Sequence, residues 1–80
     1  MRKIEKLTKR EKEVLSLVAL NYSNSEIAKK LYITIHTVKK HMESVSYKLK
    51  VTGRTACVVL AIKLGIIDVD IEQLFRREIY

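Results

Sequence analysis

Two capped helical patterns joined by only a few residues occupy the stretch from Ser23 to Lys50, SNSEIAKKLYITIHTVKKHMESVSYKLK. Ser23-Asn24-Ser25-Glu26 is a capping box, in which a serine and a glutamate three residues later satisfy the free amides at a helix start. Thr34 can cap a second, longer helix, from Ile35 to about Leu49. A short helix, a tight turn at Tyr32-Ile33 and a longer helix together predict a helix-turn-helix unit.

The longer helix separates an apolar stripe from a polar face. At 100° per residue, one arc of less than about 90° collects the hydrophobic side chains Ile35, Val38, Met42, Val45 and Leu49. The opposite side and its flanks carry polar and charged side chains: His36, Lys39, Lys40, Glu43, Ser44, Tyr47 and Lys48. We therefore expect this helix to bury its stripe and to present a basic face outward.

The remaining pattern is helical as well. Thr8 and Glu11 form another capping box for a helix from about Lys9 to Leu20, and Asn21 suits the left-handed residue at its end. Thr52-Gly53 opens a fourth helix, from Arg54 to Leu64, which Gly65 stops. The chain has no proline and two glycines, which argues against hairpins and flexible linkers.

The fourth helix is hydrophobic nearly all round, a composition typical of a helix that is buried all round. If Cys57, Val58, Ala61 and Ile62 face the protein's own core, five residues remain for a partner chain: Ala56, Val59, Leu60, Lys63 and Leu64. We read these as a homodimer interface. The alternative is that the C-terminal segment of the same chain covers them.

That segment, Asp68 to Tyr80, can form a short amphipathic helix capped by Asp68 or Asp70. Its apolar side could cover the fourth helix or extend a dimer interface, and the sequence leaves both open. The predicted fold is thus all-α: a small four-helix bundle with a helix-turn-helix over residues 1–67, plus a short fifth helix in the extension 68–80.

Charge and size narrow the class of partner. Eighty residues suffice for one small domain, and a net charge of +7 attracts polyanions, nucleic acid first and anionic membranes second. A merely well-solvated basic surface is the plainer interpretation. No apolar run spans a membrane and no signal peptide opens the chain, while the single Cys57 excludes an intrachain disulfide and fits a reducing cytoplasm.

Reactive groups are sparse. His36 and His41 lie five residues apart, about 140° around a helix, so they cannot share a metal ion, and we expect neither metal nor cofactor. Cys57 fits a small buried hydrophobe better than a redox sensor. Without a nucleophile elbow, a phosphate-cradling loop or a carboxylate pair, we expect neither enzymatic activity nor a small-molecule ligand.

LTKREKEVLSLVALNYSNSEIAKKL followed by ITIHTVKKHMESVSYKL resembles the DNA-binding domain of LuxR/NarL/GerE-type bacterial transcription regulators. The resemblance extends from about Leu7 to Ile67. It implies a four-helix bundle whose second and third helices read double-stranded DNA, and whose fourth helix pairs two subunits on an inverted-repeat operator. Glu43 is acidic where many relatives are basic or polar, so the operator does not follow from relatives.

The resemblance also implies roles for single residues. Base contacts would come from Lys39, Lys40 and Glu43, and phosphate contacts from Ser23, Asn24, Thr34, Thr37, Lys48 and Arg54. His41 and Tyr47 could also meet phosphate, or pack against the turn and the end of the bundle respectively. Glu43 could instead hold a neighbouring lysine in place. Lys50 stands where relatives often have glycine, and a left-handed lysine costs about 1 kcal/mol, so we expect either local strain or a different helix ending there.

These observations predict a cytoplasmic, sequence-specific DNA-binding transcription regulator that acts as a homodimer. The rival is a helical protein-interaction module on the same scaffold, docking on RNA polymerase or another regulator. Met1 and the added C-terminal helix favour a free-standing regulator over a fragment of a longer one.

Overall fold

The computed structural model describes residues 4–79, without the side chains of residues 78 and 79. Residues 1–3 and Tyr80, at the ends of the two predicted segments, lie outside that range. The described chain forms α1 (Lys9–Ala19), α2 (Asn24–Leu31), α3 (Ile35–Leu49), α4 (Arg54–Lys63) and α5 (Ile71–Ile79). The all-α prediction and the fifth helix are confirmed.

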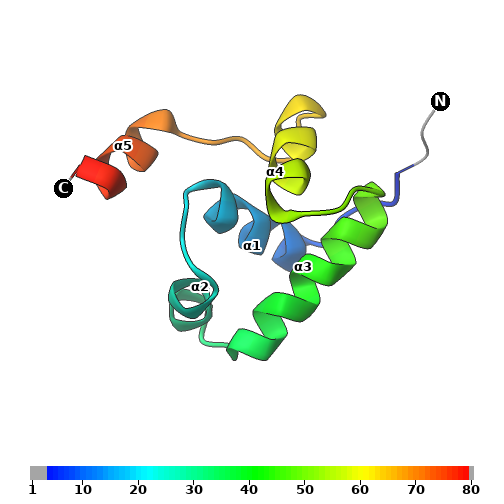
Figure 1. The fold of residues 1–80 in the computed structure, drawn as a ribbon, viewed down its shortest axis with the longest axis horizontal. Helices are drawn as coiled ribbons and strands as arrows, with labels where there is room; N and C mark the ends of the chain where they lie inside the picture. Colours follow the sequence, from blue (N-terminus) through cyan, green and yellow to red (C-terminus); the bar gives the residue numbers. More distant parts are fainter. Residues whose placement is uncertain (1–3, 80) are drawn as a thin grey trace.

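Helix α1 is the centre of the bundle. It packs against α2, α3 and α4, while α3 also packs against both α2 and α4 (Figure 1). α5 follows an extended connection and lies at the far end of the molecule from the N-terminus. The helix-turn-helix pair α2–α3 therefore occupies one side of α1, with α4 on another.

The core consists of two adjoining clusters. One joins α1 to α3 and α4 through Leu7, Leu15, Val45, Leu49, Cys57, Ala61 and Ile67. The other joins α1 to α2 and α3 through Val14, Val18, Ile27, Ala28 and Val38. Partly buried Met42 and Val58 contact both clusters. Three of the five stripe residues of α3, namely Val38, Val45 and Leu49, are fully buried, so this helix is fixed along most of its length.

The predicted helix starts are confirmed. Thr8 and Ser23 each accept a backbone hydrogen bond at 3.1 Å and complete capping boxes with Glu11 and Glu26. Thr34 caps α3 by accepting from the Thr37 amide at 3.1 Å. Gly53 begins α4 at φ +100° and Gly65 follows its end at φ +72°. Asp70 accepts the Glu72 amide at the start of α5.

Two predicted core positions are wrong. Ile35, placed in the buried stripe of α3, is 43% exposed because it lies in the first turn, at the edge of the bundle. Ile62 is exposed as well. The buried line of α4 runs through Cys57 and Ala61, four residues apart, and Ile62 is turned about 100° away from it.

The C-terminal segment does not cover the outer face of α4. Val59 remains 59% exposed, and Leu64 is also exposed. The side chains of Leu74 and Phe75 instead border an open apolar hollow whose other walls come from α1 and the first half of α4, including Val18 and Val58. Of the two interpretations of the α4 surface, the structure therefore disfavours coverage by the same chain.

Lys50 provides a test of the predicted backbone strain. It ends α3 in the left-handed conformation, at φ 57° and ψ 40°. We expect Lys50→Gly to raise the free energy of unfolding by about 1 kcal/mol, because glycine lacks the Cβ that crowds this conformation. Asn21→Gly, at φ 68°, is the matched control and should gain less, since asparagine tolerates the left-handed region. Urea unfolding measures both, and a loss of stability at Lys50 would contradict the strain.

Candidate nucleic-acid interface

The outward face of α3 carries the three predicted base-reading residues. Lys39, Lys40 and Glu43 are all exposed. The Lys40 Nζ lies 3.7 Å from a Glu43 carboxylate oxygen, one helical turn away. Without DNA, Glu43 therefore forms an ion pair with Lys40, which is the contact that the alternative interpretation of Glu43 expected. So exposed a pair is weak and can open when a stronger partner arrives.

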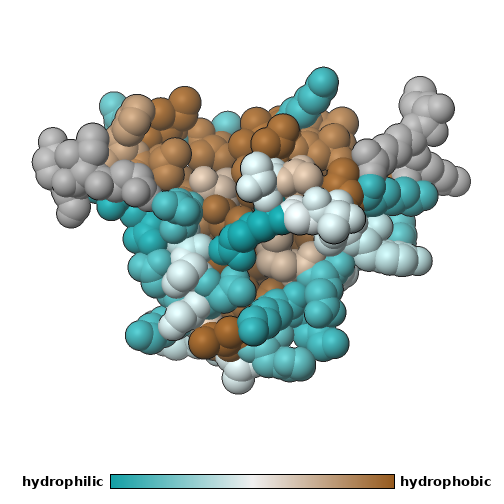
Figure 2. All heavy atoms as spheres, viewed as in Figure 1, coloured by the Kyte–Doolittle hydropathy of each residue, from teal (hydrophilic) through white to brown (hydrophobic). Residues whose placement is uncertain are grey.

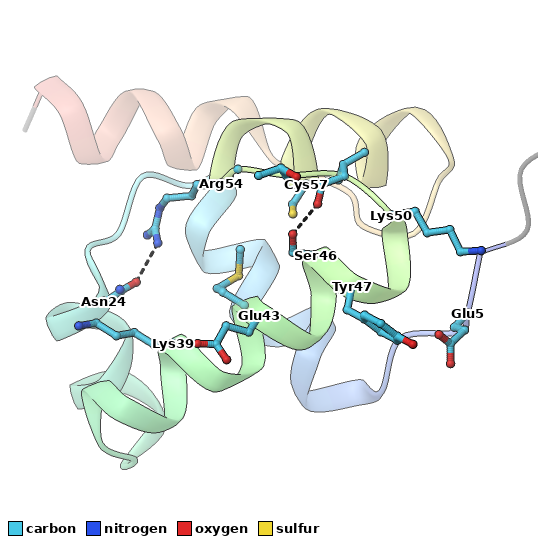
Figure 3. A pocket seen from close by; sticks show the side chains of 13 residues that line it. Glu5, Asn24, Lys39, Glu43, Ser46, Tyr47, Lys50, Arg54 and Cys57 are labelled. Carbon is cyan, nitrogen blue, oxygen red and sulfur yellow. Dashed lines mark hydrogen bonds between the residues drawn. The ribbon is translucent and has the colours of Figure 1, made fainter.

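An open hollow of about 920 Å³ lies between α3 and the segment that leads into α4 (Figure 3). Lys39, Glu43 and Tyr47 line it from α3, Arg54 from α4 and Asn24 from α2. Figure 3 shows Lys39 and Arg54 on the α2 side of the opening, and Tyr47 and Lys50 at the other end. The fold thus brings five of the predicted contact residues to one opening, from three different helices.

At the start of α2, Arg54 connects two elements. Its Nη1 donates to Asn24 Oδ1 at 2.8 Å, and its Nη2 donates to the Tyr22 carbonyl oxygen at 2.8 Å. Ser23 begins α2 immediately beside them. A helix start presents free amides and the positive end of the helix dipole, which together favour an anion. Predicted phosphate contacts from α2 and α4 therefore share one corner.

The start of α3 forms a second polar corner. The hydroxyls of Thr34 and Thr37 lie 2.9 Å apart, beside the first turn of the helix.

Tyr47 is 76% exposed, so its ring does not shield the end of the bundle as one interpretation held. His41 is half-buried.

A buried carboxylate fixes α3 against α1. Glu11 Oε1 accepts from the Thr8 amide at 2.8 Å and from Lys48 Nζ at 2.8 Å, while Oε2 accepts from the Ser44 hydroxyl at 2.6 Å. Glu11 is the one charged side chain in the buried core of the described residues. Ser44 and Lys48 are four residues apart and thus lie on the same side of α3, toward α1.

This arrangement corrects one expectation from the sequence and bears on a second. Ser44 was placed on the outer face of α3, and Lys48 on its flank, where its expected phosphate contact stays a prediction. Instead Ser44 points at Glu11, and the Lys48 side chain is only 20% exposed. The correction has a physical cause: a buried carboxylate needs a cation and donors, and these two side chains supply them.

The pKa of Glu11 reflects the same contacts. Burial by itself would raise it, but the hydrogen bonds from Lys48, Ser44 and the Thr8 amide, with the charge of Lys48, lower it from its usual 4.5 to about 2. Glu11 is therefore ionised throughout the neutral range, and the ion pair that joins the two helices is intact there.

The buried cysteine and the potential metal ligands were considered as further sites. Cys57 is buried, and burial raises the pKa of its thiol despite a hydrogen bond with Ser46. Within residues 4–79, no cluster of three His, Cys, Asp or Glu side chains is placed to hold a metal ion. Nor is any helix of that range long and apolar enough to cross a membrane.

Polarity divides the visible surface in two. Figure 2 shows hydrophilic residues gathered over α2 and α3, and hydrophobic residues along the edge formed by α4 and α5. The polar half holds the predicted nucleic-acid contacts. The apolar half includes exposed Val59, Ile62, Leu64, Ile71 and Phe75.

Several contacts that shape this surface were not predictable from the sequence. Glu11 was recognised as part of a capping box, but its partners on α3 are 33 and 37 residues away. Arg77 donates a hydrogen bond to Glu26, 51 residues earlier in the chain, and its guanidinium lies over the ring of Tyr22. The capping-box pattern cannot separate the two acids, because Glu26 holds the same position in α2 and is exposed whereas Glu11 is buried.

Comparisons with known proteins agree with this geometry. Residues 5–61 match the family described as bacterial regulatory proteins, luxR family. The response regulator protein VraR of Staphylococcus aureus is 48% identical over 64 residues, or 80% of this chain, and the same holds for VraR of Staphylococcus epidermidis. The chain spans 31% of the length of these curated relatives.

Two solved structures have similar folds. The structure of the transcription factor GerE superposes with a TM-score of 0.77 at 34% identity, covering 80% of this chain and 96% of that one. The response regulator ChrA, of a heme-sensing two-component system, gives a TM-score of 0.76 at 35% identity, covering 82% of this chain and 33% of that one.

The buried carboxylate generates a stability prediction. We expect Glu11→Gln to lower the free energy of unfolding at pH 7 by roughly 2–3 kcal/mol, because glutamine retains the capping box but loses the charge that Lys48 binds. A folded pKa of about 2, below the usual 4.5, gives stability that is full above about pH 4.5 and lost as the pH falls toward 2.

Urea unfolding at pH 7, 5 and 3 measures both effects. Between pH 5 and pH 3, the free energy of unfolding should fall much less in Glu11→Gln than in the unaltered chain. Glu26→Gln is the matched control, since Glu26 holds the same capping-box position in α2 and also binds a cation, Arg77, but is exposed and should therefore lose less stability. Equal losses in the two variants would contradict a special role for Glu11.

Proposed function

The chain belongs to the luxR family of bacterial regulatory proteins, and from this membership we propose that it binds an inverted-repeat DNA operator as a homodimer and regulates transcription. The observation that carries the proposal is the outward face of α3, where exposed lysines lie opposite a stripe that is buried at Val38, Val45 and Leu49. A helix anchored in this way can enter the major groove without unfolding any part of the bundle.

Base recognition is assigned to Lys39, Lys40 and Glu43. A lysine ammonium can donate to the N7 and O6 acceptors of guanine, and a carboxylate can accept from the amino group of cytosine. Lys40 and Glu43 contact each other across one exposed turn, so binding would exchange this weak pair for contacts with bases. Lys39 approaches from the side of the hollow that contains Asn24 and Arg54.

Phosphate contacts are assigned to the two helix starts. Ser23, Asn24 and Arg54 form the corner at α2, and Thr34 and Thr37 form the corner at α3. Such contacts set orientation and affinity rather than sequence. His41 and Tyr47 extend the same surface. Lys48 is also proposed as a phosphate contact through its exposed part, since its side chain is 20% exposed although its ammonium is bonded to Glu11.

Pairing of two copies is assigned to α4, through Ala56, Val59, Leu60, Lys63 and Leu64. Exposed Ile62 joins this surface. The apolar face of α4 lies on a different side of α1 from the helix-turn-helix, so two chains could pair there while both α3 helices face DNA. A two-fold protein dimer matches a two-fold symmetric operator. Such a regulator works in the bacterial cytoplasm, where RNA polymerase is a potential further partner.

The rival function is a protein-interaction module on the same scaffold, for which the exposed apolar face of α4 is the best support. Titration of short duplexes at several salt concentrations separates the two. A DNA binder with this net charge of +7 should lose affinity linearly in log–log form as salt rises. Absence of salt-dependent binding to any duplex would favour the rival.

Lys40→Ala tests base recognition. We expect it to narrow the ratio of operator to random-duplex affinity by about tenfold, because one good base contact supplies about 1–3 kcal/mol of discrimination. Lys9→Ala, which removes another exposed lysine, at the start of α1, is the control and should leave that ratio unchanged. Competition binding measures both variants. Equal losses on operator and random DNA would make Lys40 a phosphate contact instead.

Val59→Glu tests the pairing surface. A carboxylate at this exposed position of α4 should prevent two apolar faces from meeting, and should therefore yield monomers with weakened binding to a two-half-site operator. Sedimentation velocity measures the association state. Ile71→Glu, at an exposed apolar residue of α5, is the control. A monomer from Ile71→Glu alone would move the interface to the C-terminal helix.

A further inference from the structure

Helix α5 is attached to the rest of the protein through Arg77. Its Nη2 donates to Glu26 Oε1 at 2.6 Å and to the Asn21 carbonyl oxygen at 3.3 Å. The guanidinium carbon lies 3.5 Å from the centroid of the Tyr22 ring, a cation–π contact. The side chain is 23% exposed, and its Nε is shielded from solvent. Arg77 is thus enclosed, although it lies outside residues 5–61, which match the family.

These contacts converge on the segment that leads into the helix-turn-helix. Asn21 and Tyr22 connect α1 to α2, and Glu26 is the capping-box glutamate in the first turn of α2. From α4, Arg54 binds the Tyr22 carbonyl oxygen and Asn24. Two arginines from outside the helix-turn-helix therefore hold the short stretch that presents Ser23 and Asn24.

Charge gives this arrangement a consequence for DNA. The hydrogen bond from the Ser23 amide is the main cause that lowers the pKa of Glu26; burial opposes it, and the charge of nearby Arg77 lowers the pKa further. Glu26 is therefore an anion at neutral pH, in the same helical turn as the proposed phosphate contacts. An unpaired anion there would repel a phosphate group within the roughly 8–10 Å that salt leaves unscreened. Arg77 cancels that charge.

We infer that Arg77 is a positioning residue for DNA binding: from α5 it fixes the first turn of α2 and neutralises Glu26, so that Ser23 and Asn24 can receive a phosphate. This inference rests on the proposed function. The extension that follows the family domain then contributes to the nucleic-acid surface without touching DNA itself.

Arg77→Gln is the direct test, in the full chain and with a short operator-containing duplex. We expect affinity to fall about tenfold at low salt, the order of one lost charge-assisted contact. Arg76→Gln is the matched control. It removes the same charge from the neighbouring residue, whose side chain is 72% exposed and pairs with exposed Glu72 in the same helix. We expect a change of at most about twofold there.

The double variant separates charge from simple loss of a contact. Glu26→Gln retains the capping box, because glutamine can also accept from the amide of Ser23. Glu26→Gln combined with Arg77→Gln should recover much of the affinity that Arg77→Gln loses. Without DNA, Arg77→Gln should speed amide hydrogen exchange in the first turn of α2, whereas Arg76→Gln should not.

Three outcomes would overturn the inference or its premise. Equal affinities of Arg77→Gln and Arg76→Gln would overturn the inference alone. Lost affinity with unchanged exchange and no recovery in the double variant would make Arg77 a direct phosphate contact and overturn the positioning role. If the unaltered chain bound no duplex in a salt-dependent manner, the proposed function would fail, and hydrogen exchange would still decide whether Arg77 orders α2.

Discussion

The buried carboxylate of Glu11 determines how α3 is oriented. At the start of α1 it closes the capping box with Thr8. It also accepts hydrogen bonds from Ser44 and Lys48, which sets the rotation of α3 relative to α1. An ionised group at this depth is tolerable only while its donors remain in place. Any rotation of α3 about its axis would break those bonds. The contacts of Glu11 with Ser44 and Lys48 therefore complement the hydrophobic stripe. Burial of the stripe excludes water, but because it is non-directional it restricts the rotation of α3 about its axis much less.

Fixed in this way, α3 has one face for the core and one for solvent, and the whole molecule follows the same division. Hydrophilic side chains gather over α2 and α3, and apolar ones along α4 and α5. Arg54 and Arg77 extend from the apolar half toward the start of α2. The surface proposed to bind DNA is thus distinct from the surface proposed to bind a second copy of the chain, and the side chains of Arg54 and Arg77 connect the two.

Local signals in the sequence predicted the helices well. Capping boxes at Thr8 and Ser23, the Thr34 cap and the left-handed end at Asn21 all depend on neighbours within a few residues, and all are confirmed. At Lys50, where strain or a different ending was expected, the helix ends in the left-handed conformation. The inward and outward assignment failed where a polar side chain had a distant buried partner. Helical periodicity treats Ser44 and Lys48 as solvent-facing, because it contains no information about Glu11 more than 30 residues away.

The position of α5 was equally beyond local reasoning, since it depends on Arg77 meeting Tyr22 and Glu26. For the candidate site, the sequence identified residues that the fold does bring to one surface, including Asn24, Lys39 and Arg54. Their individual roles toward bases and phosphates remain predictions, because a groove shows where a ligand fits and not which atoms it touches.

The DNA-reading role of α3 can be measured by titrating the isotopically labelled chain with an operator duplex and following its backbone amide chemical shifts. We expect the largest changes in chemical shift in the first three turns of α3 and at the starts of α2 and α4, and small changes in α5. Changes concentrated at residues 56–64, in and just after α4, with none in α3, would show that α3 does not read DNA.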